Sequence, residues 1–98
     1  MTARKHRPKS FQDLDTLLEF LGISLEGKLI TAKEAKEIGD VGGNILMEQG
    51  GVTRTDPRNP SHIGLVRHAV HLMREKFLEL HPEHKPELEA WFDHGHKL

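Results

Sequence analysis

The longest regular pattern of apolar and polar positions runs from Ser61 to His81. Its apolar residues recur at intervals of three and four, at Ile63, Val66, Val70, Met73, Phe77 and Leu80. This spacing matches the period of an α-helix and predicts an amphipathic helix of about six turns, which Ser61 caps and Pro82 ends. Leu65, Ala69 and Leu72 widen the apolar arc to about half of the circumference, so the helix needs more than one neighbour.

A second helical pattern covers residues 11–21. Its apolar stripe is Phe11, Leu14, Leu18 and Leu21, widened by Leu17 and Phe20, and we expect this stripe to be core. Ser10 and Asp13 have the spacing of a capping box, and Gly22 is the expected helix end.

A third helix is expected over residues 32–48, opened by Thr31 with Glu34 in the capping-box position. Gly39, Gly42 and Gly43 lie inside it, at a cost of about 1 kcal/mol each relative to alanine. Gly39 and Gly43 are four residues apart and share a face. We favour a close crossing of this face against the long helix over a bend that exposes backbone N–H groups to phosphate.

The remaining segments are shorter. A last helix is expected to begin at Pro86 or Glu87 and to close the core with Leu88, Trp91 and Phe92. Residues 23–30 are compatible with a short β-hairpin or with a loop. The sequence therefore predicts a mainly α fold: a small bundle of three to four helices around the long central helix, about residues 61–81. Residues 1–9 form a basic arm in this interpretation, and residues 10–98 form a single helical domain.

Two short resemblances fall on the glycine-containing helix. Residues 30–46, ITAKEAKEIGDVGGNIL, are similar to the glycine-containing stretch of small acid-soluble spore proteins, which coat DNA. Their first ten residues also resemble the opening of some helix-turn-helix units. Each resemblance covers a small part of the chain, and no functional residue carries over from either.

Composition restricts the classes of function. The chain has 98 residues, a formal net charge of −1 and no cysteine, which excludes disulfides and thiolate chemistry. No apolar run is long enough to span a membrane, so a cytoplasmic protein without a membrane role is the expectation. Motifs of phosphate-binding loops, nucleophile elbows and dinucleotide-binding folds are absent, and we expect neither an enzyme nor a cofactor.

Charge is distributed unevenly, and this points to nucleic acid. The first ten residues carry a local charge of +4 without any acid, which leaves −5 for the rest. Such an arm can contact phosphates and release counterions, although a solubilising tail has the same composition. Two loop arginines extend the candidate surface, which comprises Arg4, Lys5, Arg7, Lys9, Arg54 and Arg58; Arg67 and Arg74 of the long helix are secondary candidates.

Eight histidines make a metal site the third hypothesis. His68, His71 and Glu75 share one face of the long helix, a spacing that can place two imidazoles and a carboxylate on one ion. That face is opposite the apolar seam, where solvent is expected. The pairs His81/His84 and His94/His96 are interpreted as surface residues.

Two functional classes thus compete with this metal-binding hypothesis. The first is a nucleic-acid-associated accessory or regulatory factor that uses the basic arm. The second is a protein-interaction module or assembly subunit, a homodimer or higher oligomer, whose partner covers the remainder of the apolar arc.

Overall fold

The computed structural model describes residues 8–50 and 55–94, with no side-chain detail at 49, 50 and 94. It confirms the mainly α fold, a small helical bundle, and contains no strand among the described residues. The elements are α1 (Lys9–Glu26), α2 (Ala32–Gly50), α3 (Pro60–Leu80), a single 3₁₀ turn η2 (Pro82–His84) and α4 (Lys85–His94). No helix among these residues is long and apolar enough to cross a membrane.

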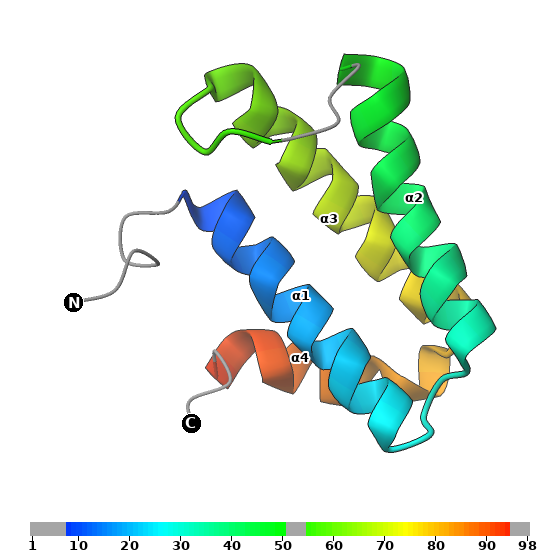
Figure 1. The fold of residues 1–98 in the computed structure, drawn as a ribbon. Coiled ribbons are helices and arrows are strands. Elements are labelled where there is room, and N and C mark those ends of the chain that lie inside the picture. Colours follow the sequence, from blue (N-terminus) through cyan, green and yellow to red (C-terminus); the bar gives the residue numbers. More distant parts are fainter. Residues whose placement is uncertain (1–7, 51–54, 95–98) are drawn as a thin grey trace.

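The helix α3 is the centre of the bundle, as its apolar seam predicts. Val66, Val70, Met73 and Phe77 are buried, and α1 and α2 both pack against them. Figure 1 shows α1 and α2 closest near the loop that joins them and spreading apart toward their other ends, with α3 between and behind them. Because only two layers of helices are stacked, the molecule is flat, with extents of 35 × 34 × 18 Å.

The start of α3 is set by Asn59 rather than by Ser61. The Asn59 side chain accepts a hydrogen bond from the Ser61 backbone N–H at 2.9 Å, and Pro60 occupies the first helical position. The expected Ser61 cap is therefore wrong by two residues, because proline is well suited to the first position and asparagine is a strong cap. At the other end α3 stops at Leu80, before Pro82, as expected.

The helix α1 runs past Gly22 to Glu26, so both the expected end at Gly22 and the hairpin near 23–30 are wrong. Its end has the hydrogen bonds of a Schellman motif: Lys28 N–H to Leu25 O at 3.1 Å and Leu29 N–H to Ser24 O at 2.8 Å. Lys28 takes the left-handed conformation, with φ of 62°. In the turn beyond Gly22, Ser24 is buried whereas Ile23 and Leu25 are exposed.

Two further expectations for α1 are also wrong. Ser10 lies inside the helix, buried and without a hydrogen-bond partner for its hydroxyl, because Pro8 takes the capping position. Leu18 is half exposed, since Leu17, Phe20 and Leu21 form the buried face.

The capping box of α2 and the closing role of α4 follow the sequence. Thr31 Oγ1 accepts the Glu34 N–H at 3.1 Å, and Glu34 Oε1 accepts the Thr31 N–H at 2.9 Å. In α4, Leu88 is fully buried, and the indole N–H of Trp91 donates to the Thr16 carbonyl at 3.1 Å. These contacts fix α4 across α1.

Candidate functional site

The predicted nucleic-acid residues fall mostly outside the described part of the chain. Arg4, Lys5, Arg7 and Arg54 are not described, so their role stays a prediction. The other two lie beside aspartates: Lys9 Nζ is 3.2 Å from Asp13 Oδ1, and Arg58 Nε is 3.5 Å from Asp56 Oδ1. These exposed pairs are weak and leave both cations accessible to a competing anion.

The secondary arginines of α3 have different surroundings. Arg67 is exposed. The guanidinium of Arg74 lies 4.3 Å from the centre of the Phe92 ring, a cation–π contact between α3 and α4. Arg74 thus has a structural role in holding the last helix.

The predicted metal-binding face of α3 lies in solvent. His71 Nε2 is 3.0 Å from Glu75 Oε2, and both side chains are more than half exposed. His68 is exposed on the same helix. Metal binding at His68, His71 and Glu75 stays a prediction. Among the described residues, the three side chains whose ligand atoms lie within 4.8 Å of one another are those of a different cluster, His81, Glu83 and His84.

An apolar hollow of about 160 Å³ lies between α1 and α2, and we call it the α1–α2 groove. Its floor is the buried face of α3, and its walls come from the diverging helices on either side. The lining residues are Leu14 and Leu18 of α1, Gly39, Gly42, Gly43 and Leu46 of α2, and Val66, Ala69 and Met73 of α3. The α3 side chains at its floor are nevertheless buried, with Val66, Ala69 and Met73 at most 3% exposed, so the open apolar surface comes from the walls of the groove.

The glycines of α2 create this groove, which corrects the expected close packing of Gly39 and Gly43 against the long helix. A Cβ atom on Gly42 would overlap the Met73 side chain, whereas one on Gly39 or Gly43 would meet no atom within 4 Å. Only Gly42 thus permits a close approach to α3. The other two leave open space because their helix face turns toward α1.

Several large apolar side chains are exposed on this part of the molecule. Leu18, at the edge of the groove, is 50% exposed, and Leu25 and Met47 are also exposed. Leu14, Leu18 and Leu25 lie at intervals of four and seven residues, so they form a stripe on the flank of α1 that faces α2. Part of the apolar surface of the bundle is therefore left uncovered by the residues that the structure describes.

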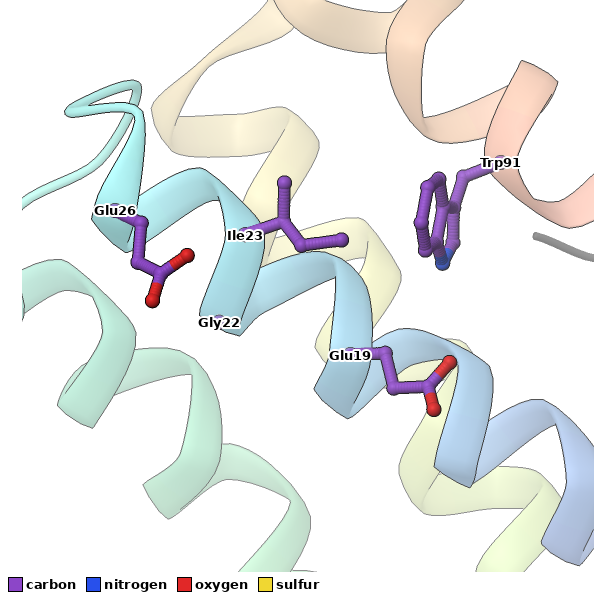
Figure 2. Close-up of a pocket in the computed structure, with 5 residues that line it drawn as sticks. All are labelled: Glu19, Gly22, Ile23, Glu26 and Trp91. Atoms are coloured by element: carbon purple, nitrogen blue, oxygen red, sulfur yellow. The ribbon is translucent and has the colours of Figure 1, made fainter. Parts of the chain in front are cut away.

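A second hollow, of about 380 Å³, lies on the opposite flank of α1. Figure 2 shows Ile23 extending toward the Trp91 ring, with Glu26 and Glu19 on either side of it along α1. Gly22 leaves room beside Ile23, where a Cβ would meet nothing within 4 Å. This hollow is shallow and open to solvent.

The histidine pair expected at the surface, His81 and His84, instead forms a compact cluster with three glutamates. His81 Nδ1 is 3.2 Å and His84 Nε2 is 3.7 Å from Glu83 Oε2. The other nitrogens face Glu34 Oε1, 2.9 Å from His81 Nε2, and Glu87 Oε1, 3.7 Å from His84 Nδ1. We call these five residues the His81 cluster; it joins the start of α2 to the junction of α3 and α4.

The local fold explains why the two imidazoles meet. Pro82 begins the 3₁₀ turn, in which side chains three residues apart are eclipsed, and the His84 N–H donates to the His81 carbonyl at 3.0 Å. The ring centres lie 5.6 Å apart. Both histidine side chains are largely covered, at 17% and 19% exposure.

The electrostatics of the cluster favour the charged forms of His81 and Glu34. Hydrogen bonds to Glu34, and then to Glu83, raise the pKa of His81 above its usual range. The hydrogen bond with His81 is the main cause that lowers the pKa of Glu34, followed by the Thr31 N–H. Charged His81 and Glu34 therefore stabilise each other across the contact between α2 and the end of α3.

Sequence reasoning missed the cluster because Glu34 is 47 residues from His81. The available signal was the His-Pro-Glu-His run at 81–84, where a proline-initiated turn brings the two imidazoles together.

Comparison of this chain with protein-family models, curated proteins and solved structures found no match. Function therefore has to be argued from the geometry of the groove and the cluster.

Proposed function

We propose that this protein is a non-enzymatic assembly subunit that forms a symmetric homodimer through the α1–α2 groove. The observation that carries the proposal is that one face has both an apolar hollow and a protruding apolar side chain, Leu18, at its edge. A two-fold interface uses the same patch on both subunits, so the patch must be complementary to itself, and a hollow beside a protruding side chain can meet this condition.

The arrangement of α1 supports a second copy as the occupant. Gly22 lies four residues after Leu18, between the apolar stripe of α1 and the Trp91 flank, and a Cβ there would meet nothing within 4 Å, so a second α1 helix can approach closely beside the stripe. In such a crossing each Leu18 enters the hollow of the other subunit beside Gly39 and Gly43. Burying Leu18 and Leu25 in this way would contribute roughly 25 cal/mol for each Å² of apolar surface removed from water.

The dimensions of the molecule are compatible with an interface of ordinary size. A standard interface buries about 800 Å² on each partner. The helices α1, α2 and α3 that line the groove belong to a molecule whose two longer extents are 35 and 34 Å. A chain of 98 residues is also in the size range where association adds to the limited core of a single subunit.

Sedimentation equilibrium over a range of protein concentrations tests the proposal. Leu18→Glu places a charge in the hollow and is expected to give monomers, whereas the wild type forms dimers. Ile23→Glu is the matched control, because Ile23 is as exposed as Leu18, 48% against 50%, but lies on the Trp91 flank. A monomeric wild type at every concentration would contradict the proposal, as would equal dissociation by both variants.

Nucleic-acid association is a second candidate, favoured by one observation, the +4 charge of the first ten residues on an otherwise acidic chain. The two proposals are compatible, since a dimer would carry two basic arms and would bind a polyanion more tightly than one arm. The salt dependence of binding distinguishes this role from assembly alone.

A further inference from the structure

We propose that His81, Glu83 and His84 form a binding site for a divalent transition-metal ion, with zinc as the best match. The three side chains offer two imidazole nitrogens and one carboxylate oxygen within 4.8 Å of one another. This site is separate from the α1–α2 groove and independent of the proposed dimer.

The distances suit one ion with little rearrangement. Zinc bonds of 2.0–2.2 Å in a tetrahedron place neighbouring ligand atoms about 3.4 Å apart. The His81 Nδ1 and Glu83 Oε2 atoms are 3.2 Å apart, and the His84 Nε2 and Glu83 Oε2 atoms are 3.7 Å apart. These two values lie on either side of the tetrahedral separation, and the imidazole nitrogens lie within 4.8 Å of each other, so side-chain rotations that draw the two rings together would place all three atoms around one centre.

A hydrogen-bonded carboxylate orients His81, and a second carboxylate lies near His84. When the Nε2 proton of His81 is donated to Glu34, the Nδ1 lone pair points to the Glu83 side. Carboxylate–histidine–metal arrangements of this kind fix the ring and increase its basicity. Glu34 is itself held by the Thr31 N–H at 2.9 Å, so the support is anchored at the start of α2. Glu87 occupies the corresponding place beside Nδ1 of His84.

The donor set determines the class of ion. Two imidazoles and a carboxylate suit zinc and its neighbours cobalt and nickel, whereas calcium and magnesium prefer oxygen ligands alone. Three protein ligands leave a fourth position for water or for an exogenous ligand. An ion here would connect α3 to η2 directly and to α2 through Glu34.

The test titrates tag-free, full-length protein with Co²⁺ followed by visible absorption and with Zn²⁺ followed by calorimetry. A tetrahedral Co²⁺ spectrum, displaced by one equivalent of Zn²⁺, is expected. Glu83→Gln and His84→Gln should abolish it, and Glu34→Gln should weaken affinity about 10- to 100-fold, because it removes only the supporting carboxylate.

The matched control is His71→Gln, which removes an exposed histidine that also lies beside a glutamate, Glu75. It should leave binding unchanged. Circular dichroism checks that each variant keeps its helix content. The proposal is overturned if folded Glu83→Gln and His84→Gln bind zinc like the wild type, if the wild type shows no such binding, or if His71→Gln abolishes it.

Discussion

The imidazole Nε2 of His81 lies 2.9 Å from the carboxylate oxygen Oε1 of Glu34, a contact between residues 47 positions apart. The same carboxylate oxygen accepts the Thr31 N–H that caps α2. One glutamate thus completes the start of α2 and fastens it to the end of α3. Because the pKa of His81 is raised in this contact, we expect the stability of the fold to depend on pH.

In metal-free protein, we expect this contact to weaken as pH rises above neutrality. The pKa of His81 is raised by Glu34 and Glu83, so its contribution is present below the unfolded pKa of about 6.5 and is lost as pH rises through the folded pKa. The pKa of Glu34 is lowered, so its contribution to stability is present above the unfolded pKa of the carboxyl and is lost only as pH falls through the acidic range.

Thermal unfolding at pH 5.5 and 8.5 in the presence of a chelator measures the effect. His81→Gln should remove part of the decrease in Tm between these two pH values, whereas His71→Gln should keep it. His84, beside the same Glu83, is the other titratable group facing His81. Identical pH profiles for the wild type and His81→Gln would contradict the assignment.

The end of α1 offers a stabilising substitution. Lys28 occupies the left-handed position of the Schellman motif, where a non-glycine residue costs about 1–2 kcal/mol. Lys28→Gly should raise the free energy of unfolding by about 1 kcal/mol or less, because added freedom in the unfolded chain offsets part of the gain. Chemical denaturation checks this; a decrease in stability would mean that the lysine side chain contributes more than the backbone costs.

The three glycines of α2 are expected to respond differently to alanine. Gly39→Ala and Gly43→Ala should each stabilise the subunit by up to about 1 kcal/mol through helix propensity, since nothing lies within 4 Å of the added Cβ. Gly42→Ala should raise the free energy of unfolding less than the other two substitutions, or lower it, because the added Cβ displaces the Met73 side chain. Denaturation in a Leu18→Glu background measures the single subunit, and equal effects at all three positions would contradict the packing at Gly42.

Binding to nucleic acid tests the basic arm. Replacing Arg4, Lys5 and Arg7 by glutamine should weaken binding to duplex DNA or RNA. On duplex DNA, the slope of log affinity against log salt should fall by about 0.9 for each phosphate that the arm no longer neutralises. Lys85→Gln is the control, since Lys85 is exposed beside Glu89 on α4, outside the arm. No binding by the wild type at low salt would remove this function from consideration.

The sequence predicts the helices of this fold well because their apolar periods are long. The seam of α3, the Thr31–Glu34 capping box and the buried Leu88 all follow from local spacing. Helix ends are harder to predict. Gly22 resembles a stop, but the left-handed conformation that ends α1 is taken by Lys28, six residues later.

The candidate sites depend on tertiary geometry that periodicity does not contain. Leu18 fits the core stripe of α1 by spacing, yet α1 and α2 diverge and leave it half exposed. Gly39 and Gly43 share a helix face as predicted, but that face turns to the groove rather than to α3. The His81 cluster depends on a turn and on a glutamate from another helix, so counting histidine spacings on one helix could not find it.

Disulfide trapping between subunits tests the central claim, the homodimer, most directly, because the chain contains no cysteine. Leu18→Cys protein is mixed with Gly43→Cys protein under mild oxidation, and cross-linked heterodimers are quantified by mass spectrometry. The proposed interface predicts efficient Leu18–Gly43 cross-linking and little cross-linking when Ile23→Cys replaces Leu18→Cys. Equal yields for the two pairs, or none for either, would contradict a dimer formed through the α1–α2 groove.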